Sequence, residues 1–274
     1  MDAAKILPFA VFQLCAIFLP MQWAHAAEAK LTAIEASAGT AHDSVFRVMC
    51  PQTNSEGTAF LYNSTLLLTA SHVVENCTKP QIRLQNGTIV PADVQAFDDG
   101  PDMAALRPDT PITGKTFHLA KSGSAFRLGE EVVTWGFPGG YQGREPFLSV
   151  GYFGGVNPSK DKENRPTTKY IINAAFNHGN SGGPLISTET GDLIGIVTDK
   201  LIPFNQRTLN AISALQSTKS GLQYERPNSG QSFSEAQVVS MVLYDLMQNA
   251  QIVVGMATTS DDVRKFLRDN HLPE

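Results

Sequence analysis

Short apolar runs separated by turn signals dominate the chain between Val45 and Val254. The runs lack helical periodicity, and segments such as Asn86-Gly87 and Pro138-Gly139-Gly140 divide many of them. This pattern predicts an antiparallel β-barrel or sandwich. The expected strands are Val45–Met49, Thr58–Tyr62, Leu66–Thr69, Gln81–Leu84, Met103–Leu106, Glu131–Trp135, Leu148–Tyr152, Tyr170–Ile172, Leu193–Thr198 and Ile252–Met256.

Two later segments have helical spacing. One begins at Ser234, which has the spacing of a capping box with Gln237, and the other spans about residues 259–270 with a cap at Asp262. We interpret both as packing elements of their own domain, with partner binding by the first as the alternative. The first carries an apolar stripe of Val238, Val239, Val242, Leu243, Leu246 and Met247, and the second has Val263, Phe266 and Leu267 on one face.

Two polar stretches are interpreted as loops. Pro203–Phe233 is rich in Ser, Thr, Gln and Asn, which predicts a long surface loop. Because long loops often carry function, we hypothesise that it gates a neighbouring substrate cleft. Lys160–Lys169 is dense in charges of both signs and is interpreted as a solvated loop.

The overall composition is that of a globular protein. The 274 residues are 42% hydrophobic and 17% charged, enough for one large core or two modest ones. The formal net charge is −5 and the basic residues are scattered, so the chain lacks the basic surface that nucleic-acid binding requires. We therefore expect no nucleic-acid partner.

The N-terminus has the pattern of a secretory signal peptide. Lys5 precedes an apolar run from Ile6 to Pro20, and Ala24-His25-Ala26 supplies small residues before a cut after Ala26. No other segment approaches the roughly 20 apolar residues of a membrane span. We expect a secreted or periplasmic protein without a membrane anchor after cleavage; an uncleaved anchor is the alternative.

Two of the three cysteines remain after such a cleavage. Cys15 would leave with the signal peptide, whereas Cys50 and Cys77 form an even pair in an oxidising compartment. A disulfide between them would close a loop of about 27 residues and stabilise the fold by roughly 3 to 4 kcal/mol. Two buried free thiols are the alternative.

The run Gly179-Asn180-Ser181-Gly182-Gly183-Pro184 marks Ser181 as a candidate nucleophile. A serine attacks only with a base to take its proton, a carboxylate to hold that base and donors for the oxyanion. Glycines beside Ser181 let backbone N–H groups approach a substrate carbonyl. A bare Gly-x-Ser-Gly match is common by chance, but the longer run is much more specific.

The candidate base is His72, which directly follows the apolar run Leu66–Thr69. Of the other histidines, His178 is the serious rival, and we place it at the edge of the substrate cleft. The candidate carboxylate is Asp102, at the start of the buried run 103–106, with Asp98 and Asp99 as close competitors before the Gly100-Pro101 turn. The weaker histidines are His25, His42, His118 and His271.

These segments resemble the chymotrypsin-like (trypsin-fold) serine peptidases, and most closely the bacterial branch related to the periplasmic high-temperature-requirement proteases. The matching segments occur in the family's order, with His before Asp before Ser. They are Gly57–Phe60, Leu68–Val74, Pro101–Ala104, Trp135–Gly139, Gly179–Pro184 and Gly195–Thr198.

The resemblance implies an all-β fold of two antiparallel six-stranded β-barrels, with a C-terminal helix and an extra inserted helix. It places the first barrel at about residues 44–120, the second at about 121–258, the insertion at about 203–250 and the final helix at 259–270, within a peptidase domain spanning 27–274. His72 and Asp102 would come from the first barrel and Ser181 from the second.

The resemblance also implies binding roles. The N–H groups of Gly179 and Ser181 would form the oxyanion hole, and Thr198 would support the aspartate on a strand that pairs with substrate. Ala175 would form the floor of the specificity pocket, which favours a small or medium apolar side chain. Asn180 replaces the aspartate that binds a new N-terminus in digestive relatives, so activation by that ion pair is not expected.

The sequence therefore predicts a serine endopeptidase that acts on proteins or peptides and needs no cofactor or metal; its oligomeric state is left open. A protein that keeps the fold but only binds peptides is the alternative from another class. A zinc protein using His72, Cys50 and Cys77 is the third, although no paired short ligand spacing exists.

Overall fold

The computed structural model describes residue 35 and residues 39–123, 126–161, 164–201, 204–225, 230–249 and 253–273. The predicted signal peptide, residues 1–26, lies outside the described residues. In the part of the chain that is described, no helix has the length and apolar character needed to cross a membrane.

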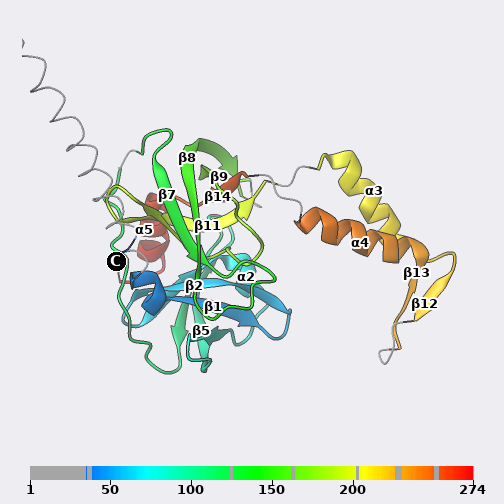
Figure 1. Ribbon diagram of the computed structural model, residues 1–274, viewed down its shortest axis with the longest axis horizontal. Helices are drawn as coiled ribbons and strands as arrows, with labels where there is room; N and C mark the ends of the chain where they lie inside the picture. The colour runs from blue at the N-terminus through cyan, green and yellow to red at the C-terminus, as the bar shows by residue number, and fades with distance from the viewer. Residues whose placement is uncertain are drawn as a thin grey trace, which may run out of the picture.

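Two closed antiparallel β-barrels form the body of the molecule (Figure 1), which confirms the predicted fold class. The first barrel has the strand order β1-β2-β3-β6-β5-β4. Its strands are β1 (Val45–Cys50), β2 (Ser55–Asn63), β3 (Leu66–Thr69), β4 (Gln81–Arg83), β5 (Ile89–Asp98) and β6 (Met103–Pro108), with the short helix α2 (Ser71–Val74) after β3.

The second barrel has the strand order β10-β11-β14-β9-β8-β7. Its strands are β7 (Glu131–Gly136), β8 (Phe147–Lys160), β9 (Pro166–Asn173), β10 (Pro184–Ser187), β11 (Leu193–Lys200) and β14 (Gly255–Ala257). Every expected strand coincides with part of an observed one, apart from the start of the run at Ile252, which lies outside the described residues.

Strands β5 and β10 were not expected. The buried positions of β5 are small residues such as Ala92 and Ala96, and Pro91 and Asp93 interrupt them, so the apolar signal is weak. Strand β8 also runs much further than expected, to Lys160, and pairs with Pro166 of β9. The interpretation of Lys160–Lys169 as one solvated loop is therefore wrong, because its last residues belong to β9.

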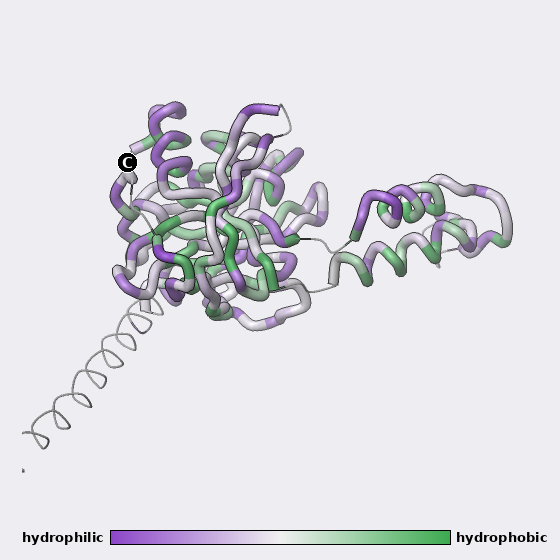
Figure 2. Tube along the Cα trace, turned by 90° about the horizontal axis from the view of Figure 1, so that it is seen from above, coloured by the Kyte–Doolittle hydropathy of each residue, from purple (hydrophilic) through white to green (hydrophobic). Residues whose placement is uncertain are grey.

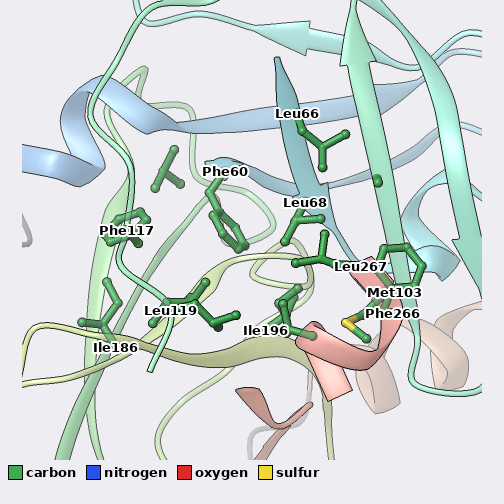
Figure 3. Close-up of a cluster of buried hydrophobic side chains, with 14 of the residues drawn as sticks. Phe60, Leu66, Leu68, Met103, Phe117, Leu119, Ile186, Ile196, Phe266 and Leu267 are labelled. Atoms are coloured by element: carbon green, nitrogen blue, oxygen red, sulfur yellow. The ribbon is translucent and has the colours of Figure 1, made fainter. Parts of the chain in front are cut away.

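The helix α5 (Ser260–Asp269) confirms the predicted C-terminal helix. Thr259 caps it, and the Oγ1 of Thr259 accepts a hydrogen bond from the backbone N–H of Asp262 at 3.0 Å. Its buried face joins side chains of both barrels in one apolar cluster (Figure 3), so α5 helps to hold the barrels together across the line where they meet. This cluster includes Phe60, Leu68 and Met103 of the first barrel, Ile186 and Ile196 of the second, and Phe266 and Leu267 of α5.

An arm formed by residues 204–249 extends away from the barrels (Figures 1 and 2). It contains α3 (Gln206–Ser217), α4 (Glu235–Asn249) and a two-stranded sheet of β12 (Gln223–Glu225) and β13 (Ser232–Ser234). The expected inserted helix is α4, but the expectation of a long loop before it is wrong, because α3, β12 and β13 lie in that stretch. The signal that marks α3 is Asn205, whose side chain caps the helix by accepting from the N–H of Thr208.

The predicted cap of α4 is confirmed. The backbone N–H of Ser234 donates to Gln237 Oε1 at 2.9 Å, and the N–H of Gln237 donates to Ser234 Oγ at 3.3 Å. The apolar stripe of this helix, however, does not become a buried domain surface: Val239, Val242, Leu243 and Leu246 are exposed. The interpretation of α4 as an ordinary packing element is wrong for this face.

The predicted disulfide is confirmed between Cys50, at the end of β1, and Cys77, which follows α2. Their Cα atoms are 5.7 Å apart, within the usual range for a bridge. Sulfur atoms joined in this way are not available as thiolate ligands, and no cluster of metal-ligating side chains occurs among the described residues. The zinc alternative therefore has no support.

Candidate active site

A cleft of about 510 Å³ lies where the two barrels meet. His72 and Asp102 line it from the first barrel, and Ser181 and Thr198 line it from the second. The order of strands explains this meeting, because α2 follows β3 directly, Asp102 precedes the neighbouring strand β6, and Ser181 precedes β10. The structure thus brings together the three residues that the sequence selected from distant positions.

His72 is held by Asp102 through its ring and its backbone. The Nδ1 atom of His72 lies 2.9 Å from Oδ2 and 3.0 Å from Oδ1 of Asp102, and the backbone N–H of His72 donates to Oδ1 at 3.1 Å. A carboxylate at Nδ1 leaves the other ring nitrogen free to accept a proton.

Asp102 has a left-handed backbone, with φ of 62°. A non-glycine residue in this region is strained and persists where the surroundings hold it in place. Here Ser71 donates from its hydroxyl to Asp102 Oδ1 at 2.8 Å. Of the competing carboxylates, Asp99 shares the hydroxyl of Ser71 at 3.1 Å, and Asp98 accepts from the N–H of Gly100 at 2.9 Å.

The His72–Asp102 pair is electrostatically coupled. Burial acts to lower the pKa of His72, but the hydrogen bond and negative charge of Asp102 outweigh it, so the pKa lies above its ordinary value of 6.5. Burial acts to raise the pKa of Asp102, but its hydrogen bonds with His72 and Ser71 and the charge of His72 hold it below 3.8. Asp102 is therefore ionised at neutral pH.

Two further charges, Lys169 and Asp199, act on His72, and sequence reasoning gave neither of them a role in the triad. Lys169 projects from β9 into the cleft, where its Nζ donates to the carbonyl oxygen of Pro101 at 3.0 Å and lies 3.5 Å from Thr198 Oγ1. Burial lowers the pKa of Lys169, and its positive charge lowers that of His72. Asp199 acts in the opposite direction and raises the pKa of His72.

The hydroxyl of Ser181 donates to the backbone carbonyl of Thr198 at 3.2 Å. Proton transfer to His72 requires the hydroxyl to turn from this carbonyl toward the imidazole. Catalytic hydrogen bonds are often absent from ligand-free active sites and tighten when substrate binds, so this arrangement is compatible with a nucleophilic role.

The loop that carries Ser181 presents unused backbone donors. Among the described residues, no acceptor takes a hydrogen bond from the backbone N–H of Gly179 or Ser181. Gly179 has φ of 91°, and a Cβ there would lie 2.2 Å from the carbonyl oxygen of Phe137, so only glycine fits. Two free N–H groups beside a serine are the donors that an oxyanion requires.

Thr58 of β2 holds this loop from the other barrel, a role that sequence reasoning missed. Its Oγ1 donates to the carbonyl of Gly179 at 2.7 Å, and its N–H donates to the carbonyl of Ser181 at 2.8 Å. The same Oγ1 accepts from the N–H of Phe137 at 3.1 Å. In the sequence, the segment Gly57–Phe60 was identified only by its resemblance to the family. Nothing local distinguishes Thr58 from an ordinary buried threonine in a strand.

The apolar part of the cleft is lined by Phe176, Val197 and Met256. Phe176 is buried, and its ring packs so closely over Gly255 that a Cβ on the glycine would lie 2.0 Å from it. Ala175, the predicted floor of the specificity pocket, is not among the residues that line the cleft as the structure describes it, whereas Phe176 is.

His178 lines the cleft as predicted. Its backbone carbonyl accepts from the N–H of Gly139 at 2.5 Å, which links the serine loop to the end of β7. Burial and the charges of Lys200 and His72 lower the pKa of His178.

Comparison with known proteins agrees with this geometry. The family model of the trypsin-like peptidase domain matches residues 57–196, about half of the chain. Serine protease HTR4 of Rattus norvegicus is 37% identical over 172 residues, which cover 58% of this chain and 33% of the relative. Serine protease HTRA2, mitochondrial, of Bos taurus is 34% identical over 151 residues, which cover 54% and 32%. The chain thus spans about a third of these relatives.

Solved structures share the double barrel. The active form of the Rv3671c protease from M. tuberculosis superimposes with a TM-score of 0.60 at 19% identity, covering 87% of this chain and 85% of that one. The HtrA-type protease AlgW with a tripeptide gives a TM-score of 0.58 at 20% identity, covering 85% and 62%. These likenesses concern the fold. The family match extends from β2, which holds the serine loop, to β11. On the basis of this match the chain belongs to the trypsin-like peptidase family, related to the HtrA serine proteases.

Proposed function

We propose that this protein is a serine endopeptidase that hydrolyses peptide bonds in proteins or peptides through His72, Asp102 and Ser181. The observation that carries the proposal is the convergence of the ion-paired His72 and Asp102 with Ser181 in one cleft between the barrels. The relatives are named as serine proteases, which supports the same reaction class.

The proposed reaction proceeds through an acyl-enzyme. Ser181 attacks the peptide carbonyl while His72 takes its proton, and the N–H groups of Gly179 and Ser181 bind the oxyanion. The protonated His72, held by Asp102, then donates to the leaving amine. Water attacks the acyl-enzyme with His72 again as base, which releases the second product and restores Ser181.

Two binding roles belong to the same proposal. Thr198 and its strand β11 lie beside Ser181 and would pair with the substrate backbone, with the Thr198 carbonyl released from the Ser181 hydroxyl. His178 would contact the substrate at the edge of the cleft. Substrate side chains would enter the apolar part of the cleft, which Phe176 lines.

A fluorophosphonate probe tests the nucleophile, because it phosphonylates only an activated serine. The wild-type protein should be labelled, and Ser181→Ala should lose both labelling and casein cleavage. Ser159→Ala is the matched control, since Ser159 also lines the cleft but belongs to β8 and lies outside the proposed triad. Labelling that survives in Ser181→Ala would refute the assignment.

A binding protein without turnover is the second candidate. One observation favours this candidate: the Ser181 hydroxyl donates to the backbone carbonyl of Thr198 rather than to His72. Peptide-library cleavage decides between the two. A binding module would retain peptides without cutting them and would resist the probe, whereas an endopeptidase would be labelled and release fragments.

We also propose that the protein is exported to the periplasm or the medium. The disulfide between Cys50 and Cys77 supports this, because such bridges persist in oxidising compartments. Cell fractionation combined with N-terminal sequencing tests it; a mature chain that begins at Ala27 is expected, and a cytoplasmic chain beginning at Met1 would exclude export.

A further inference from the structure

Helix α4 of the arm is apolar on more than one side. Its inner side packs on α3, where Ser240 donates from Oγ to the carbonyl of Ile212 at 3.1 Å and Met247 is buried. Its outer side carries Val239, Val242 and Leu246, of which Val242 is 54% and Leu246 62% exposed. A helix that is apolar all round normally lies in an interior.

The two helices of the arm differ in this respect. On α3 the side opposite Ile212 is polar, with Arg207, Asn210 and Ser217 exposed to solvent. The arm therefore has a polar, solvent-exposed surface on α3 and an apolar, solvent-exposed surface on α4. In Figure 2 the arm stands apart from the barrels, so these do not cover it. Two helices with one uncovered apolar face are half of a four-helix bundle.

We propose that a second copy of this chain covers the face, with the two α4 helices pairing across a two-fold axis near Val242 to form a four-helix bundle. This interaction surface goes beyond the proposed peptidase function and does not depend on it. A two-fold contact uses the same patch on both copies, so the Val239, Val242 and Leu246 stripe supplies its own complement.

The uncovered area supplies part of what a dimer needs. With ordinary side-chain surface areas, the exposed apolar residues of α4 present on the order of 500 Å². A stable interface buries about 800 Å² per partner. Leu222 and Tyr224 of the β12–β13 end, which are also exposed, would supply much of the remainder.

Charge favours a second copy over an anionic membrane. Residues 204–249 contain three basic residues and three acidic ones, so the arm has no net charge and two arms do not repel each other. The basic residues are Arg207, Lys219 and Arg226, and the acidic residues are Glu225, Glu235 and Asp245. The only charges on α4 are acidic, whereas helices that lie on anionic membranes carry lysine or arginine on the polar face.

Charge also sets the orientation. In a parallel pair of α4 helices, Glu235 would face Glu235 and Asp245 would face Asp245. In an antiparallel pair centred on Val242, Glu235 lies at the C-terminal end of the other α4 and Asp245 faces Val239 of the other copy, so no acidic residue meets another. The two barrels then lie at opposite ends of the bundle.

Sedimentation analysis of the full chain, as processed by the producing cell, tests the proposal. The wild type at micromolar concentration should have twice the chain mass. Val242→Glu places like charges against each other at the axis and should be monomeric, with unchanged helix content by circular dichroism. Asn210→Glu adds the same charge to the outer face of α3 and should remain a dimer.

A complementary pair and a cross-link give independent readings. Mixing Val242→Glu with Val242→Lys should restore a dimer of unequal copies, and Val242→Cys should form an intermolecular disulfide that Asn210→Cys does not form. A monomeric wild type, a dimer that persists in Val242→Glu, or flotation of the wild type with neutral phosphatidylcholine vesicles that Leu246→Glu abolishes would overturn the proposal.

Discussion

The hydroxyl of Thr58 donates a hydrogen bond to the carbonyl oxygen of Gly179 at 2.7 Å and so ties the first barrel to the serine loop of the second. The bond fixes the peptide plane that follows Gly179, next to the N–H of Ser181. A single threonine therefore links the positions of His72 and Ser181, which come from different barrels.

Thr58→Val should lower kcat/KM about 10-fold or more, because small displacements of reacting groups are costly. It should also lower the free energy of unfolding by about 1–3 kcal/mol, since buried polar groups at Gly179 and Phe137 lose their partner. Thr58→Ser keeps the hydroxyl and should retain most activity. Equal activity of all three proteins by steady-state kinetics would contradict the role.

The acid limb of the pH profile should report His72. Only neutral imidazole can accept the proton of Ser181, so kcat/KM should rise as pH increases through the pKa of His72, at a midpoint above 6.5. Asp102→Asn removes the charge that raises this pKa, while asparagine tolerates the left-handed backbone. It should move the midpoint down and reduce kcat by about 10⁴-fold.

Lys169 and Asp199 should shift that midpoint in opposite directions. Lys169→Met removes a charge that lowers the pKa of His72, so the acid limb should move to higher pH; Asp199→Asn should move it to lower pH. Lys200→Met is the control, because Lys200 acts on His178 rather than on His72. Parallel losses of activity without any change of midpoint would show that the two side chains are merely structural.

Phe176 should limit the size of the substrate side chain that enters the cleft. Phe176→Val opens space above Gly255 and should raise kcat/KM for a leucine substrate relative to alanine by about 10-fold or more, at a cost of about 1–3 kcal/mol in stability. Ala175→Ser should leave the ranking unchanged, since Ala175 does not line the cleft. A peptide series varied at that one position provides the measurement.

The disulfide should contribute mainly to stability. Replacing Cys50 and Cys77 by serine should lower the free energy of unfolding by about 3–4 kcal/mol, because the unfolded chain regains a loop of 27 residues. Urea unfolding measures this. Dithiothreitol should lower the midpoint of the wild type to a similar extent and leave the double variant unchanged; an effect on both would indicate another cause.

The local sequence predicted most of the fold because barrel strands appear in it as short apolar runs. Runs such as Leu66–Thr69 are buried throughout, and turn residues separate them. The helix α5 was visible for the same reason, through its cap at Asp262 and its apolar face. Strand β5 was missed because the barrel buries small residues there. Helix α3 was missed because Ile212 is its only buried residue, so its apolar pattern is weak even though Asn205 marks its start.

The sequence by itself determined the residue types of the candidate site. The glycine-rich run around Ser181, the segment around His72 and the order of the two already indicate nucleophile and base. The roles of Thr58, Lys169 and Phe176, and the exposure of α4, were decided only by the tertiary structure. Each depends on contacts or solvent exposure created when distant strands and helices meet, and neither distance nor burial is recorded in neighbouring residues.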